Sequence, residues 1–175
     1  MGRDTTFGAA LLKAHLATGS KVPVQGRVFL SLRPEDKCER ALAIARGYRE
    51  LGFEILATSG TAAFLREHGI EAETVLKHYE GRPSIIDYIK NGQVHILINT
   101  PLGERARHDE FIMGMTALQH KIPFFTTLAA AEASLEAIKA LRAGTFGVYA
   151  LQEEYGDGWN PYVSSSASVR RATAR

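Results

Sequence analysis

The chain has 175 residues, of which 45% are hydrophobic and 23% are charged, a balance typical of one packed domain with extensions. Its formal net charge of +2 is too small to favour a nucleic-acid binder, and its single cysteine excludes an internal disulfide and a cysteine-only zinc site. No apolar run approaches the ~20 residues of a membrane span, and no signal-peptide pattern is present. We therefore expect a cytoplasmic protein with neither a membrane nor a nucleic-acid partner.

The first predicted element is an amphipathic helix over residues 5–18. Phe7 and Leu11 fall on its apolar stripe, and Asp4 or Thr5 is placed to cap its first turn. Residues 19–23, Gly-Ser-Lys-Val-Pro, then break the helix. Because this helix precedes the regular pattern and is separated from it, we expect it to be an appendage.

Strands and helices alternate from Gly26 onward. Apolar runs predict strands at residues 28–32, 53–57, 72–76, 94–98 and 123–126. Helices are predicted to follow them, from Pro34 to just before Gly52 and over residues 61–68, 83–90, 107–120 and 129–141. Alternation with short connections predicts right-handed crossovers. We therefore expect an α/β three-layer sandwich, doubly wound around a five-stranded parallel sheet.

The first of these helices and the C-terminal residues carry further expectations. Cys38 falls on the apolar stripe of the helix that begins at Pro34, with Leu42, Ala45 and Tyr48, so we expect it in the core. Residues 146–151 are compatible with a short edge strand, and we expect disorder from about residue 163.

The stretch Thr58-Ser59-Gly60-Thr61 stands between the second strand and its helix. It combines three hydroxyls and a glycine with backbone N–H groups that have no helical partner. These groups and the positive end of the helix dipole favour an anion. A simple capped helix explains the same residues, because Thr and Ser are common N-caps.

The other strand ends supply matching groups. The carboxyl ends of parallel strands open on one edge, where ligands of doubly wound folds bind at the point of reversed strand order. The polar residues there are the cations Lys37, Lys77 and Arg82, the hydroxyls of Thr58, Ser59, Thr61, Thr100 and Thr127, and the amide of Asn99. Cations with hydroxyls at a helix N-terminus suit a phosphate, and an amide with hydroxyls suits a ribose or base.

Several other chemistries lack their motifs. The sequence has no GxxxxGK[ST] P-loop, no GxGxxG after a strand and no GxSxG nucleophile elbow. The six histidines show no HxxxH or HxH spacing, so we expect no metal site.

Five motifs resemble the C-terminal allosteric domains of carbamoyl phosphate synthase large subunits, which belong to the methylglyoxal synthase-like family. In the family's order, they are Ser-Leu-Arg-Pro-Glu-Asp-Lys (31–37), Ala-Thr-Ser-Gly-Thr-Ala (57–62), Glu-Gly-Arg-Pro (80–83), Ile-Asn-Thr-Pro-Leu-Gly (98–103) and Thr-Thr-Leu-Ala (126–129). The resemblance implies a helical linker from a preceding synthetase domain at 1–25, the allosteric domain at 26–155 and a flexible tail at 156–175. The protein would then be a fragment of a larger subunit.

The resemblance implies a regulatory domain that is not itself catalytic and needs no cofactor. Bacterial domains of this kind bind UMP as inhibitor, IMP as activator, and ornithine at a nearby interface. Carried over by motif, the phosphate site would comprise Lys37, Thr58, Ser59, Gly60, Thr61, Lys77 and Arg82. The ribose or base would lie near Asn99, Thr100, Asp109 and Thr127.

The same resemblance implies an ATP-dependent ligase as the parent enzyme. That enzyme would use ATP with Mg or Mn, and glutamine or ammonia, to make carbamoyl phosphate for pyrimidines and arginine. The implied partners are the rest of the large subunit and the glutaminase small subunit, and a homo-oligomer is compatible with the resemblance.

The sequence departs from the family's pattern at three positions. Ser59 stands where some relatives have histidine, and Pro101 and Glu104 stand where others have threonine and arginine. These departures bear on which effector binds.

The alternative function is a methylglyoxal synthase-type phosphate lyase acting on dihydroxyacetone phosphate. That reaction needs a carboxylate base to remove a carbon-bound proton. The family's catalytic Gly-Gly-Asp falls on Glu80-Gly81-Arg82, and its second aspartate falls on Thr100. This alternative therefore requires Glu80 to act as a displaced base.

Overall fold

The computed structural model describes residues 2–19, 21–100, 103–144 and 147. In chain order, its elements are α1 (Phe7–Ala17), β1 (Gly26–Ser31), a 3-10 turn η1 (Pro34–Asp36), α2 (Glu39–Glu50), β2 (Phe53–Ala57), α3 (Ser59–Glu67), β3 (Glu73–Thr74), α4 (Ile85–Lys90), β4 (Ile96–Asn99), α5 (Gly103–Gln119), β5 (Phe124–Phe125) and α6 (Leu128–Ala143). The predicted strand at 146–151, the disorder from residue 163 and the tail at 156–175 fall outside the described residues.

The strands form one parallel sheet in the order β3-β2-β1-β4-β5, which confirms the predicted α/β class. Pairing joins Leu30 to Ala57 on one side of β1, and Ser31 to Asn99 on the other. The order reverses at β1, because the chain passes to β2 and β3 on one side and to β4 and β5 on the other. The carboxyl ends of β1 and β4 therefore flank the crevice where ligands of such folds bind.

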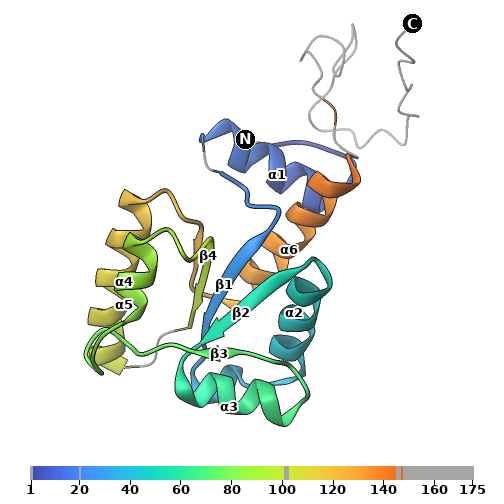
Figure 1. The fold of residues 1–175 in the computed structure, drawn as a ribbon. Coiled ribbons are helices and arrows are strands. Elements are labelled where there is room, and N and C mark those ends of the chain that lie inside the picture. The colour runs from blue at the N-terminus through green and yellow to red at the C-terminus, as the bar shows by residue number, and fades with distance from the viewer. Residues whose placement is uncertain (1, 20, 101–102, 145–146, 148–175) are drawn as a thin grey trace, which may run out of the picture.

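Alternating side chains of the strands supply two hydrophobic cores. Val28 and Leu30 of β1 face α2, α3 and α6, whereas Phe29 faces α4 and α5. Figure 1 shows α4 and α5 on one side of the sheet and α2 and α6 on the other. The three layers are those predicted from the sequence.

The N-terminal helix packs on α6. Ala9 and Leu12 are buried against Ala137 and Ala140 in a third hydrophobic cluster. The backbone of Gly8 approaches α6 so closely that a β-carbon on it would lie 2.7 Å from the Glu136 carbonyl oxygen. The helix predicted as an appendage is therefore closely packed on α6, which covers one face of the sheet.

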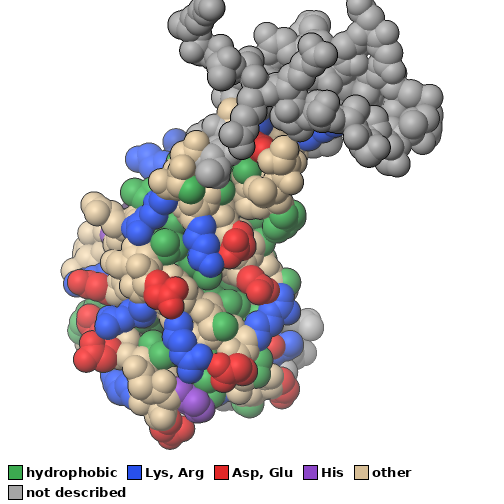
Figure 2. Space-filling view, turned by 90° about the vertical axis from the view of Figure 1, so that its right-hand side faces the viewer, with side chains coloured by type: hydrophobic (Ala, Val, Ile, Leu, Met, Phe, Trp, Pro, Cys, Tyr) green, Lys and Arg blue, Asp and Glu red, His purple; other side chains and the backbone are tan. Residues whose placement is uncertain are grey.

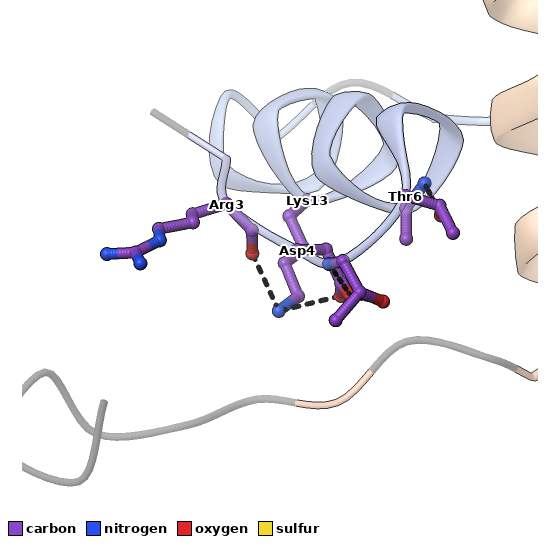
Figure 3. Close-up of polar contacts among 6 residues, drawn as sticks. Arg3, Asp4, Thr6 and Lys13 are labelled. Atoms are coloured by element: carbon purple, nitrogen blue, oxygen red, sulfur yellow. Dashed lines mark hydrogen bonds and ion pairs between the residues drawn. The ribbon is translucent and has the colours of Figure 1, made fainter. Parts of the chain in front are cut away.

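The first turn of α1 differs from the prediction (Figure 3). Thr6, rather than Asp4 or Thr5, caps the helix by accepting a hydrogen bond from the Ala9 N–H at 3.3 Å. The Asp4 carboxylate lies 2.9 Å from the Lys13 ammonium and accepts from the Thr5 N–H at 2.7 Å. Partial burial opposes ionisation of Asp4, but these bonds outweigh it, and its pKa is lowered.

Two residues expected in the core are exposed. Phe7 is 67% exposed, because the buried side of α1 is formed by Gly8, Ala9 and Leu12. Cys38 is also exposed. The helix predicted from Pro34 is interrupted: η1 ends at Asp36, and Cys38 has extended backbone angles as the residue before α2.

Gly8→Ala is expected to lower the free energy of unfolding by up to about 2 kcal/mol. Alanine favours a helix over glycine by about 1 kcal/mol, but a methyl pressed against rigid backbone costs about 1–3 kcal/mol. Urea unfolding followed by circular dichroism measures the net effect. Gly114→Ala on α5 is the control, because its added carbon meets only the flexible ring edge of Phe124 at 3.3 Å. A Gly8→Ala protein as stable as the Gly114→Ala protein would contradict the close α1–α6 contact.

Charge is mixed on the side of the molecule that carries α2. Figure 2 shows basic and acidic side chains interspersed on that face. Ion pairs there join Arg46 to Glu39 and Arg49 to Glu71. This face therefore lacks the single-sign basic patch of a nucleic-acid interface.

The described residues contain neither a membrane-spanning helix nor a cluster of metal ligands. None of the helices there has the length and apolarity that crossing a membrane requires. In the same part of the protein, no three or more histidine, cysteine or acidic side chains are grouped as a metal ion would need.

Candidate functional site

The N-terminus of α3 lies directly after β2 and is open to solvent. α3 begins at Ser59, two residues before the predicted start, so Ser59 and Gly60 are exposed residues of its first turn. Thr58 is the N-cap residue, but its side chain does not cap the helix. Its hydroxyl instead donates to the Thr61 hydroxyl oxygen at 3.1 Å. The first N–H groups of the helix are therefore left for an outside acceptor.

Lys37 brings a positive charge to this helix end. A β-carbon on Gly60 would lie 3.2 Å from the Lys37 ammonium nitrogen, so the ammonium lies against the backbone of Gly60. Within the described part of the protein, the Lys37 ammonium makes no ion pair or hydrogen bond. A cation at the positive end of a helix dipole is unfavourable alone and favourable once an anion lies between them. Lys37, Ser59 and Gly60 therefore form the core of the candidate anion site.

Lys77 and Arg82 lie on the neighbouring loop, which follows β3. The Lys77 N–H donates to the Glu80 carboxylate at 2.9 Å, and its ammonium is 3.4 Å from the Tyr79 hydroxyl. Arg82 is exposed. No contact among the described residues joins either cation to Lys37 or Gly60. The topology brings this loop to the same edge, because β3 pairs with β2 in parallel.

Three predicted ligand hydroxyls are buried and used within the protein. Thr58 and Thr61 are 5% and 1% exposed, and the Thr61 oxygen also accepts from the Leu32 N–H at 3.0 Å. Thr100 is 4% exposed, and its hydroxyl oxygen accepts from the Arg33 N–H at 3.0 Å. Thr61 and Thr100 therefore hold the loop that follows β1.

The predicted ribose and base residues divide between two sides of the sheet. Asn99 ends β4 at a position that alternates with Ile98, so it belongs to the side covered by α4 and α5. Thr100 and Thr127 lie on the side of α6, and Thr127 caps that helix by accepting from the Ala130 N–H at 3.2 Å. Asp109 lies within α5, and its side chain is outside the described part of the structure.

Asn99 is the most unusual of these polar residues. It is only 4% exposed, and its side-chain amide makes no hydrogen bond to another described residue. The side-chain amide of Asn99 offers donor N–H groups and an acceptor oxygen that a ligand can contact. Asn99 is therefore well suited to contact a ligand at the carboxyl edge.

A cavity of about 440 Å³ opens at the carboxyl ends of β1, β4 and β5. Thr100 and Thr127 line it, together with Arg33, Asp36, Arg40, Thr126, Leu128 and Ala129. The Arg33 guanidinium is paired with the Asp36 carboxylate at 2.8 Å. Sequence reasoning missed Arg33, Asp36, Arg40 and Thr126, although Arg33, Asp36 and Thr126 lie within stretches recognised after strands one and five.

Residues 40–126 match a family model described as an MGS-like domain, and this match includes β2, β3, β4 and β5. Residues 40–126 belong to the MGS-like domain family.

Curated relatives extend the similarity of this MGS-like domain on both sides of the matched range. A carbamoyl phosphate synthase large chain of Archaeoglobus fulgidus is 46% identical over 153 residues, which cover 87% of this chain and 14% of the relative. Two relatives described as C-terminal sections of such large chains, from Methanopyrus kandleri and Aquifex aeolicus, are 44% and 42% identical over 162 and 160 residues. Those alignments cover 92% and 89% of this chain and 30% of each relative.

The MGS-like domain is thus homologous to the C-terminal section of carbamoyl phosphate synthase large chains. It spans between 14% and 30% of the length of these three relatives. The family membership confirms the resemblance seen in the five motifs.

The carboxylate that the alternative lyase function would need, that of Glu80, already accepts a hydrogen bond within this MGS-like domain. Glu80, the displaced base of the alternative function, accepts the Lys77 N–H at 2.9 Å. Thr100, at the position of the second aspartate, accepts the Arg33 N–H. Asp36 borders the cavity but is paired with Arg33. Among the described residues, no carboxylate makes an ion pair with the Lys37 ammonium.

Proposed function

We propose that this MGS-like domain is the regulatory domain of a carbamoyl phosphate synthase and binds nucleoside monophosphate effectors such as UMP or IMP. One observation carries the proposal: the Lys37 ammonium lies against Gly60, in the first turn of the uncapped helix α3, and no carboxylate of the described residues is paired with it. This arrangement is suited to a phosphate dianion, which can accept from backbone N–H groups and from the ammonium together.

The phosphate would lie over the first turn of α3. Ser59 and Gly60 would donate their backbone N–H groups, and the Ser59 hydroxyl is exposed and able to add a third donor. Lys77 and Arg82 would supply further positive charge from the loop after β3. Their long side chains suit this role, because neither needs to contact Lys37 before the ligand arrives.

The nucleoside would extend from this phosphate across the ends of β1 and β4. Asn99 offers both a donor and two acceptor lone pairs to a ribose or a base. Asp109 and Thr127 remain candidates for the same part of the ligand, whereas the hydroxyl oxygen of Thr100 already accepts the Arg33 N–H. The two sides on which Asn99 and Thr127 lie are alternative directions for the base.

The parent protein is part of the same proposal. The relatives named above are large chains of carbamoyl phosphate synthase, so the partners would be the rest of that subunit and a glutaminase small subunit. The parent would use ATP with Mg or Mn and serve pyrimidine and arginine synthesis. Ornithine at an interface and a homo-oligomer also belong to this proposal, and the protein would act in the cytoplasm.

Calorimetric titration of the 175-residue protein with UMP and with IMP tests the proposed function. Heat of binding is expected with at least one nucleotide and with inorganic phosphate, but not with uridine or inosine, which lack the charged group that Lys37 would recognise. Binding of a nucleotide should also raise the melting temperature by mass action. If no phosphate compound produced either heat of binding or a thermal shift, effector binding would be refuted. Dihydroxyacetone phosphate is included, and formation of methylglyoxal above background would favour the lyase instead.

Gly60→Ala is expected to weaken nucleotide binding about tenfold without lowering stability. The new β-carbon would meet the Lys37 ammonium at 3.2 Å and displace it from the helix end. A displaced charge-assisted contact costs about 1.5 kcal/mol or more, whereas alanine in a helix is favoured over glycine by about 1 kcal/mol. The UMP titration and a urea unfolding curve measure the two effects separately. Equal affinity in the variant and the wild type would show that Lys37 does not act from this position.

A further inference from the structure

Beyond Leu30, the ladder of hydrogen bonds between β1 and β2 continues through the hydroxyl of a threonine side chain instead of a backbone carbonyl. The Thr58 N–H donates to the Leu30 carbonyl at 3.2 Å, so the next ladder bond would join the Leu32 N–H to the Thr58 carbonyl. That carbonyl is instead turned to the first turn of α3, where it accepts from the N–H groups of Thr61 and Ala62 at 2.9 and 2.7 Å. The Leu32 N–H therefore donates to the Thr61 hydroxyl oxygen at 3.0 Å instead of to the Thr58 carbonyl.

The same substitution occurs on the side of β4. The Thr100 N–H donates to the Ser31 carbonyl at 2.9 Å, so the next ladder bond would join the Arg33 N–H to the Thr100 carbonyl. The Arg33 N–H instead donates to the hydroxyl oxygen of Thr100 at 3.0 Å. Two buried threonines, from opposite neighbours of β1, therefore hold two consecutive residues of the departing loop.

The loop carries this restraint on to Lys37 through a compact turn. The N–H groups of Asp36 and Lys37 donate to the carbonyls of Arg33 and Pro34 at 3.1 and 3.2 Å. The Arg33 guanidinium is also paired with the Asp36 carboxylate at 2.8 Å. Because the turn is closed by these contacts, the placement of Arg33 largely fixes where the Lys37 side chain begins.

We propose that Thr61 and Thr100 are positioning residues whose hydroxyl oxygens hold the backbone of Leu32 and Arg33 and so keep the Lys37 ammonium at the N-terminus of α3. This inference rests on the proposed phosphate-binding role of Lys37. It gives these two threonines a different task from contact with the ligand, for which their burial leaves little surface. Each oxygen accepts a backbone N–H, so serine can replace threonine, whereas valine, which has a similar shape, cannot.

Amide hydrogen exchange in the ligand-free protein tests the restraint directly. Thr61→Val should speed exchange of the Leu32 N–H by at least about tenfold, and Thr100→Val should do the same for the Arg33 N–H, because each loses its acceptor. Thr61→Ser and Thr100→Ser should leave both rates near those of the wild type. Unchanged rates in the valine variants would overturn the proposal without any reference to a ligand.

A double-mutant cycle with UMP tests whether the threonines act through Lys37. Binding is followed by the NMR shift of the Gly60 amide, which remains measurable when affinity is weak. Thr61→Val or Thr100→Val alone should reduce affinity about tenfold, but less than about twofold when Lys37→Ala is already present.

The outcomes of the cycle separate the two proposals. A full tenfold loss in the Lys37→Ala background would mean that the threonine touches the ligand itself, which overturns the positioning role while the proposed function stands. Absence of any UMP-dependent shift in the wild type would refute the proposed function, and the exchange rates would still decide the loop restraint. If Thr61→Val does not fold, Thr100→Val provides the same comparison from the other side of β1.

Discussion

Replacing Lys37 by alanine is expected to reduce the affinity for UMP or IMP about 10- to 150-fold, which corresponds to the loss of one charge-assisted contact worth about 1.5–3 kcal/mol. The same change should leave the ligand-free protein as stable as the wild type, or more stable by about 0.3–1 kcal/mol. Removal of a cation from the positive end of α3 relieves an unfavourable interaction. Calorimetric titration and a urea unfolding curve measure these two opposite effects.

Lys90→Ala is the matched control for this variant. Lys90 is an exposed lysine at the last turn of α4, which leads back to the amino edge of the sheet, so its loss changes the net charge equally. Its removal should change the affinity less than about twofold, because exposed charges beyond a Debye length are screened. Equal losses for the two lysines would indicate a general effect of charge and would contradict a specific contact with Lys37.

Gly26→Ala is expected to lower the free energy of unfolding by about 4 kcal/mol. Gly26 has a φ of +125°, a conformation that L side chains rarely adopt and that costs about 1–3 kcal/mol. An added β-carbon would also lie 2.5 Å from the ring of His95, whose Nδ1 accepts the Arg27 N–H at 3.1 Å. The ring could move only by breaking that bond, so a steric cost of about 1–3 kcal/mol adds to the conformational one.

Urea unfolding of Gly26→Ala beside Gly52→Ala separates these two costs. Gly52 has a φ of +78°, but no atom lies within 4 Å of its ideal β-carbon position. Alanine there should cost about 1 kcal/mol from conformation alone. A further variant, Gly26→Ala with His95→Ala, should recover part of the loss. Equal costs at Gly26 and Gly52 would show that the His95 contact does not contribute.

The fold could be predicted from the sequence because its strongest signals are local. Short apolar runs marked the strands, and glycines in left-handed conformations closed the helices at Gly69, Gly92 and Gly144. Ile85, Ile86 and Ile89 are buried on one stripe of α4, as their spacing requires. Helical periodicity gives the wrong position for Cys38. The apolar stripe predicts Cys38 in the core only if one helix runs from Pro34, but Cys38 has extended backbone angles and separates η1 from α2.

The candidate site could be predicted only in part, because burial and hydrogen bonding decide what each hydroxyl does. Residue type marks Thr58, Thr61 and Thr100 as potential ligands of a phosphate or a ribose. Only the structure reveals that each oxygen already has a partner within the protein. The approach of Lys37 to Gly60 depends on a turn between β1 and α2 that no local pattern predicts.

The packing of α1 on α6 has a mechanical consequence. The first residues of α6, Leu128 and Ala129, border the 440 Å³ cavity, whereas Ala137 and Ala140 further along it pack on α1. A helix of 16 residues is a stiff rod about 24 Å long. A push or pull delivered to the N-terminal helix would therefore reach the cavity wall as a shift of this rod, with no need for the sheet to deform.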